Sequence, residues 1–176
     1  PMIGTNDLAD QSKRGVFTTN GTTTPTLNLA GGTITPGRWV VINAPSTTIT
    51  ITSNINYDDT ARLSSIADIP QVVIIAKNII IADGVTNIDA WLVAKGADTA
   101  TDGKIITCQT AGELVRITGL QCVQPLNVNG PVIANKLFLG RTAGSGGPAS
   151  QAGEPAEIFD LRPDAYLWAY YHATTN

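Results

Sequence analysis

The chain has 176 residues, 14% charged residues and a formal net charge of -3. A chain of this length can bury a substantial core as one domain. Its 11 Lys and Arg residues form no basic cluster, so we do not expect a nucleic-acid partner. Gly, Thr, Asn, Ile and Val are frequent, which favours short strands and tight turns over long helices.

We also expect no membrane span. A helix that crosses a bilayer needs about 20 predominantly apolar residues. The longest apolar run, 71–82, is shorter, and Lys77 interrupts it. Since no run is long enough to span a bilayer, the chain itself is expected to be soluble. The first residues contain no basic region followed by an apolar signal-peptide core, and a longer precursor with a signal or an anchor stays open.

The first 25 residues are polar and contain several turn signals. They predict an extended lead-in with one short strand at 16–18. From residue 26 onward, strand patterns follow one another. Leu27 and Leu29 alternate with polar residues, and the stretch 47–57 alternates Ile with Thr or Asn, as half-buried strands do.

The most apolar stretch, "PQVVIIAKNIIIADGVTNIDAWLVAKG" at 70–96, divides into pieces of three to six residues. We place a corner at Lys77 and Asn78. The connections are too short for helical crossovers, and "GPVIANKLFLGRT" at 130–142 repeats the same style. These features predict an all-β, single-domain β-solenoid, or parallel β-helix, over 26–140.

Two further segments follow the predicted solenoid. Residues 141–157 are rich in Gly, Pro and Ser and predict a flexible loop. Residues 158–176 predict a C-terminal cap that lies over an open end of the solenoid, where unpaired strands otherwise invite aggregation. The alternative for this segment is an interaction surface. Either role falls to its aromatic residues: Phe159, Tyr166, Trp168, Tyr170 and Tyr171.

The two cysteines, Cys108 and Cys122, are 14 positions apart. An even cysteine count in a chain with few charges favours a disulfide in an exported protein. Such a bond closes a loop of about 15 residues and stabilises the fold by about 3 kcal/mol. Two buried free thiols are the alternative.

Catalytic and metal-binding patterns are weak. The single histidine, His172, lies in a polar tail and cannot form a multi-histidine zinc site. Asp98 and Asp102 are weak calcium candidates, because "DTATDG" lacks the other ligands of a calcium loop. Asp83 and Asp89 keep open a carbohydrate-acting enzyme. We expect no enzymatic activity and no cofactor.

Four segments carry a resemblance: "NIDAWLVAKG", "IITC", "LNVNGPVIANKLFLGRTAG" and "PAEIFDLRPDAYLWAY". Over about residues 70–171 the chain resembles uncharacterised exported surface proteins of ultrasmall candidate-phylum bacteria. The resemblance implies an exported, surface-attached structural domain whose pattern includes both cysteines. It implies no enzymatic activity and no catalytic residues. In the style of its strands the chain also looks loosely like bactofilin-type polymerising β-helices.

The sequence therefore predicts a secreted or cell-surface structural or adhesion protein, a possible subunit of a self-assembling filament. Its expected partners are further copies of itself, as a homo-oligomer or polymer, with surface glycans or proteins as further candidates. Two alternatives stay open. One is a carbohydrate-acting β-helix enzyme, and the other is a segment of a viral or phage fibre.

Overall fold

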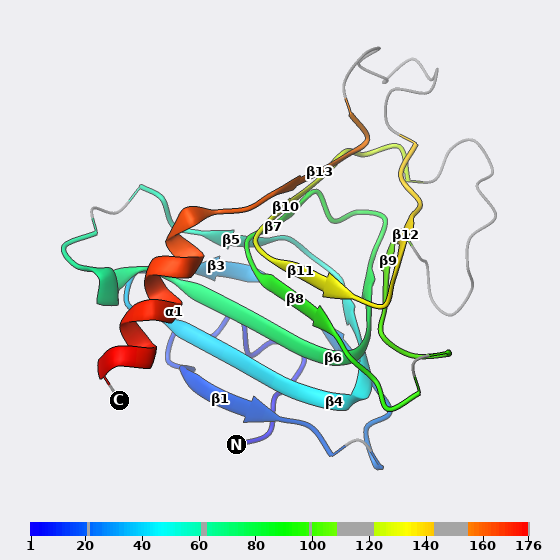
Figure 1. Cartoon of the computed structure of the whole chain (residues 1–176), viewed down its shortest axis with the longest axis horizontal. Coiled ribbons are helices and arrows are strands. Elements are labelled where there is room, and N and C mark those ends of the chain that lie inside the picture. Colours follow the sequence, from blue (N-terminus) through cyan, green and yellow to red (C-terminus); the bar gives the residue numbers. More distant parts are fainter. Residues whose placement is uncertain (21, 61–62, 99, 109–121, 143–154, 176) are drawn as a thin grey trace.

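The computed structural model describes residues 1–20, 22–60, 63–98, 100–108, 122–142 and 155–175. Within these residues the chain is mostly β (Figure 1). The strands are β1 Gly15–Thr18, β2 Thr26–Leu29, β3 Gly32–Ile34, β4 Trp39–Ile51, β5 Ile55–Tyr57, β6 Gln71–Ile81, β7 Asn87–Ile88, β8 Trp91–Ala94, β9 Lys104–Thr107, β10 Leu126–Asn129, β11 Val132–Ala134, β12 Lys136–Leu139 and β13 Glu157–Asp160. A 3-10 turn, η1, spans Ile66–Asp68, and a helix, α1, spans Pro163–Thr175.

The strands form two parallel sheets. The larger sheet has eight strands, with β1, β4, β6, β8 and β11 in order, β2 beside β4, and β9 between β6 and β12. The smaller sheet has the order β13, β10, β7, β5, β3. Each strand therefore pairs with a strand that comes much later or much earlier in the chain. Figure 1 shows the larger sheet rising from β1 to β11.

Alternation of side chains fixes the register of these pairs. In β6, Ile74, Ile79 and Ile81 are fully buried and alternate with partly exposed residues. In the neighbouring strands β4 and β9, the residues paired with Ile79 are Ile49 and Ile105, and both are also fully buried. A slip of one residue would turn every one of these side chains to the outside.

The prediction of a closed β-solenoid is wrong. The strands form two separate parallel sheets and are accompanied by one C-terminal helix. All-parallel sheets are typical of α/β proteins, although α1 is the single α helix among the described residues. The predicted corner at Lys77 and Asn78 does not divide the strand either, because β6 runs through it as 11 continuous residues.

Two predictions of local structure are confirmed. The short strand expected at 16–18 is confirmed as β1. The disulfide between Cys108 and Cys122 is also confirmed, and both cysteines are almost fully buried. Most of the loop expected at 141–157 lies outside the described residues.

The helix α1 lies beside the first residues of β4 and β6 (Figure 1). Its first residue is Pro163, whose fixed φ suits the first helical position. The Trp168 ring packs 6.3 Å from the Trp39 ring, measured between centroids. The helix thus packs beside the start of β4 in the larger sheet, and its predicted role as a cap over an open end stays a prediction.

The N-terminal residues cover the first strands. Ile3 and Leu8 are buried in the core, and Ala9 lies against Gly32 of β3. Arg38, which is 4% exposed, holds this segment in place. Its guanidinium donates hydrogen bonds to the backbone oxygens of Asp7 (3.0 Å), Leu8 (2.8 Å) and Lys13 (2.7 Å). We call this part of the molecule the covered end.

We expect Arg38→Met to destabilise the covered end, because three backbone oxygens lose their donors. The free energy of unfolding should fall by about 2–3 kcal/mol, and amide exchange in residues 2–13 should accelerate. Urea denaturation followed by hydrogen-exchange mass spectrometry measures both effects. The control is Arg14→Met, at an exposed arginine nearby; equal losses in the two variants would contradict this role of Arg38.

Candidate functional site

The opposite end of the molecule exposes its core. Here β11, β12 and β13 are the last strands of their sheets, and their inward-facing side chains continue ladders that are buried below. Leu137 is 43% exposed, although its partner Ile105 in β9 is fully buried. Phe159 is 37% exposed, although its partner Val128 in β10 is fully buried.

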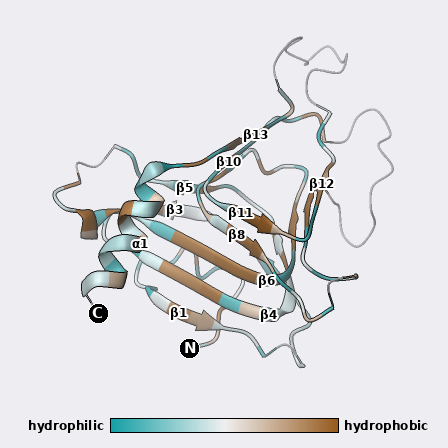
Figure 2. Cartoon of the chain, in the orientation of Figure 1, coloured by the Kyte–Doolittle hydropathy of each residue, from teal (hydrophilic) through white to brown (hydrophobic). Residues whose placement is uncertain are grey.

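We call this surface the open end. It comprises the inward-facing residues of the three last strands: Val132, Ala134, Leu137, Leu139, Glu157 and Phe159. Leu139 is its most exposed apolar member, at 58%. Figure 2 shows apolar residues along both β11 and β12. Apolar strands with unpaired edges are surfaces on which further strands can pair.

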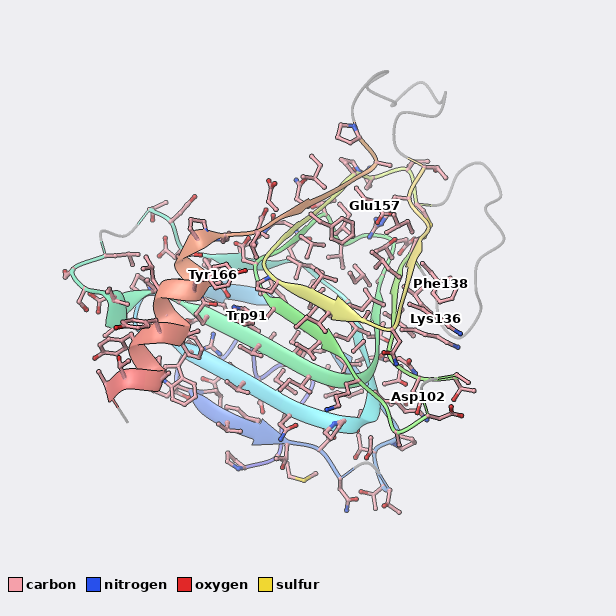
Figure 3. The ribbon with its side chains drawn as sticks, in the orientation of Figure 1. Trp91, Asp102, Lys136, Phe138, Glu157 and Tyr166 are labelled. Atoms are coloured by element: carbon pink, nitrogen blue, oxygen red, sulfur yellow. A yellow bond between two sulfur atoms is a disulfide. The ribbon has the colours of Figure 1, made fainter. Side chains whose placement is uncertain are left out.

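Charged side chains of both signs surround the open end. Lys136 and Phe138 project outward from β12 (Figure 3), and Lys136 Nζ donates to the backbone oxygen of Ala100 at 3.0 Å. On β13, Asp160 is exposed and Glu157 faces inward. Charges on edge strands restrict which partners can pair there.

Glu157 is held in place by its neighbours. Its Oε1 accepts hydrogen bonds from Thr107 Oγ1 at 2.7 Å and from the backbone N–H of Arg141 at 2.9 Å. Its Oε2 is buried and has no hydrogen-bond partner among the described residues. The open end therefore contains one buried carboxylate oxygen without a hydrogen-bond partner among the described residues.

Arg141 supports the open end from below. It is 7% exposed, and its guanidinium donates to the backbone oxygens of Ala82 and Val85, both at 2.8 Å, and to that of Asp83. Burial lowers the pKa of Arg141, while Glu157 and Asp83 oppose that shift. The arginine thus ties the end of β12 to the turn after β6.

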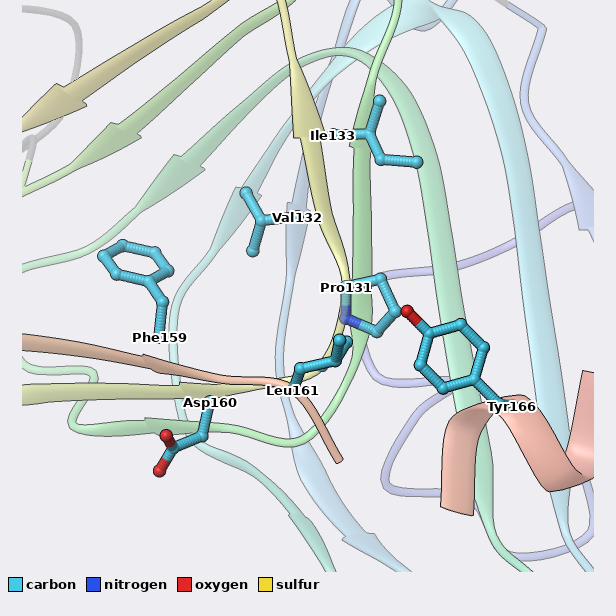
Figure 4. A pocket seen from close by; sticks show the side chains of 8 residues that line it. Pro131, Val132, Ile133, Phe159, Asp160, Leu161 and Tyr166 are labelled. Atoms are coloured by element: carbon cyan, nitrogen blue, oxygen red, sulfur yellow. The ribbon is translucent and has the colours of Figure 1, made fainter. Parts of the chain in front are cut away.

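A groove runs from the open end towards α1. It has a volume of about 420 Å³ and lies between β11, β13 and the first turns of α1 (Figure 4). Phe159 and Tyr166 lie on its two sides, with Pro131 and Leu161 between them. Its lining residues are Gly130, Pro131, Val132, Ile133, Phe159, Asp160, Leu161 and Tyr166.

A polar network beneath the groove fixes the start of α1. Asp89 is 5% exposed and accepts hydrogen bonds from the Tyr57 backbone N–H at 2.6 Å and from Asn129 Nδ2 at 2.8 Å. Arg162 lies 3.8 Å from Asp89 Oδ1 and also pairs with Asp164. Because Arg162 follows Leu161, this network positions the groove residues on either side of it.

The structure separates the aromatic residues predicted to act together. Phe159 belongs to β13, and Tyr166 lines the groove from α1. Trp168 and Tyr171 pack against His172, and Trp168 also packs against Trp39. Tyr170 is 72% exposed. Their predicted role as a cap or interaction surface remains a prediction.

The calcium candidates are engaged within the protein. Asp98 Oδ1 accepts from the Ala100 backbone N–H at 2.8 Å. Asp102 forms an ion pair with Lys77 at 3.4 Å and accepts from the Asp98 backbone N–H at 3.2 Å. Hydrogen bonds from Ala100 and Thr101 lower the pKa of Asp98. No cluster of three or more metal-ligating side chains occurs among the described residues.

The aspartates considered for catalysis lie in different surroundings. Asp89 is buried in the network beneath the groove, whereas Asp83 Oδ1 accepts from the neighbouring Gly84 N–H at 2.9 Å. No sequence pattern predicted the roles of Arg38, Arg141 and Arg162. The only local signal at Arg38 and Arg141 is a preceding glycine, in "GRW" and "LGRT", which is too common to indicate a buried arginine.

We expect Tyr57→Phe to change how stability depends on pH. Burial raises the pKa of Tyr57 far above its usual value near 10. The unfolded chain therefore releases the phenolic proton first, and the contribution of neutral Tyr57 is present below pH 10 and lost as pH rises above it. The hydroxyl also accepts from the Val72 backbone N–H at 2.8 Å.

At pH 7 the variant should therefore be about 1–3 kcal/mol less stable than the wild type, because the Val72 donor loses its partner. Above pH 10 this difference should shrink by about 1.4 kcal/mol per pH unit. Urea denaturation at pH 7, 9, 10 and 11 measures it. If the difference in the free energy of unfolding between the two proteins stays constant from pH 7 to pH 11, the raised pKa of Tyr57 in the folded state is contradicted.

Comparison with known proteins adds no relative. No family model, no curated protein and no solved structure matches the chain. Among the described residues, no helix is both long enough and apolar enough to cross a membrane. The resemblance to exported surface proteins therefore remains an expectation from the sequence, and the proposals below depend on the open end and the groove.

Proposed function

We propose that the protein is an extracellular structural subunit that associates with a second copy of itself through the open end. The observation that carries this proposal is the exposure of inward-facing Leu137, Leu139 and Phe159 at the top of otherwise buried ladders. Each exposed apolar side chain loses the stabilisation of burial, about 25 cal/mol per Å². A partner molecule that buries these side chains restores that stabilisation.

The disulfide supports an extracellular location. Bonds of this kind persist in oxidising compartments and are rare in reducing ones. Cys108 directly follows β9, and its backbone N–H donates to Ile81 of β6 at 2.9 Å. The bond therefore fixes Cys122 beside the end of β9, which lies between β6 and β12 in the larger sheet.

The two ends differ, and this difference selects the mode of association. Head-to-tail stacking would require the open end to meet the first strands of the next copy. Ile3, Leu8 and Ala9 already cover those strands. A two-fold arrangement, in which two open ends face each other, needs no rearrangement of the covered end and closes after two copies.

The open end is suited to this two-fold arrangement. Its apolar row meets an identical apolar row, and antiparallel pairing of last strands can keep inward-facing residues opposite each other. Its border carries a cation, Lys136, and an exposed carboxylate, Asp160. A second copy can therefore place its Lys136 towards a carboxylate, which fixes orientation more than it adds affinity.

Sedimentation equilibrium over a range of concentrations tests the proposal. We expect the wild-type chain to form a dimer. Leu139→Lys should weaken that dimer by roughly a hundredfold, because a desolvated ammonium replaces an apolar contact. The matched control is Val16→Lys on β1, an apolar residue of similar exposure (51%) at the other edge of the larger sheet.

A wild-type monomer at all concentrations would overturn the proposal. So would an obligate trimer, which favours a viral fibre segment, or an open polymer, which requires head-to-tail contacts. Equal weakening by Val16→Lys and Leu139→Lys would also contradict it. Circular dichroism of each variant verifies that the substitutions leave the fold intact.

A further inference from the structure

We infer that the groove between β11, β13 and α1 binds a neutral saccharide chain. This inference does not depend on self-association. Val132 and Phe159 belong to both surfaces, but the groove extends away from the open end along Pro131, Leu161 and Tyr166 (Figure 4). Its volume of about 420 Å³ falls in the range of small-ligand sites.

The charge of the groove restricts the ligand. Asp160 is the only charged residue among the eight that line it. Phosphate, sulfate and carboxylate groups find no cation there, and they would be repelled by Asp160. The nearby Arg162 is directed into the network with Asp89 and Asp164 and does not line the groove. A neutral ligand with hydroxyl groups fits these constraints.

The aromatic residues of the groove supply the ring faces that a sugar needs. A hexose presents apolar C–H faces and a rim of hydroxyls, so its binding needs both ring faces and hydrogen-bond acceptors. Tyr166, 56% exposed, and Phe159 provide rings on the two sides of the groove. Neither ring makes a ring–ring contact among those found in the described residues. Tyr166 adds a hydroxyl, and the exposed Asp160 carboxylate lies at the border of the groove and points away from the other lining side chains (Figure 4).

The network beneath the groove makes the site rigid. Arg162 joins Asp89 to Asp164 at the start of α1, and its guanidinium lies 5.0 Å from the centre of the Tyr57 ring. The Asp160 backbone oxygen accepts from the Gly130 N–H at 2.8 Å, which joins the end of β13 to the turn between β10 and β11. A preformed site loses little entropy when its ligand binds.

Native affinity electrophoresis tests this inference. The probes are gels that contain laminarin, hydroxyethylcellulose or galactomannan, with polygalacturonate as the anionic comparison. We expect the wild type to be retarded by at least one neutral polysaccharide. Tyr166→Ala should weaken that binding by about tenfold. The control Tyr170→Ala, at an exposed tyrosine outside the groove on the same helix, should leave it unchanged.

The dimer variant Leu139→Lys separates this inference from the proposed function. It should lose self-association but keep its retardation by the neutral polysaccharide. No retardation by any neutral probe, retardation by polygalacturonate alone, or equal losses in Tyr166→Ala and Tyr170→Ala would overturn the inference. Binding of choline without polysaccharide binding would also overturn it and would assign the groove to a cation.

Discussion

The structure depends on the parallel register of its strands. Each inward-facing side chain lies on the equivalent side chain of a neighbouring strand, as Ile49, Ile79 and Ile105 do. This arrangement buries a side chain fully only when a further strand follows. The constraint stabilises the middle of each ladder and leaves its last member exposed. The open end is thus a direct consequence of the pairing that stabilises the core.

The covered end and the open end differ in how the last side chains of their ladders are covered. At the covered end the chain supplies its own lid, residues 1–13, and Arg38 binds that lid through three backbone oxygens. At the open end, the buried Arg141 likewise binds backbone oxygens, but those of Ala82 and Val85 in the turn after β6. It therefore holds a turn within the protein and does not attach a covering segment. The apolar row above it is left without a lid among the described residues, which is why we propose a second copy as its partner.

The sequence predicted local features well. Alternation of Leu27 with Leu29, and of Ile49 with Ile51, correctly indicated strands with one buried face. The spacing of Cys108 and Cys122 correctly indicated a disulfide. Alternation does not reveal how strands are assigned to sheets, however. The closed solenoid was wrong because period-two patterns are the same in one closed coil and in two separate sheets.

The candidate site was harder to predict for a related reason. "PVIANKLFL" has the same pattern as buried strands in 70–81, and nothing local indicates that its strands are the last of their sheets. The aromatic residues of 158–176 were predicted to act as a group. Phe159 is separated from the others, because β13 ends at Asp160 and the helix begins at Pro163. Buried arginines that bind backbone oxygens leave no sequence signal, because their partners are carbonyl groups that every residue carries.

Self-association through the open end is the central claim, and hydrogen exchange at several protein concentrations tests it most directly. The account predicts that amides in 132–139 and 157–160 become more protected as concentration rises, while those of β1 stay unchanged. Protection that is independent of concentration in both regions would contradict it, as would concentration-dependent protection at β1 alone.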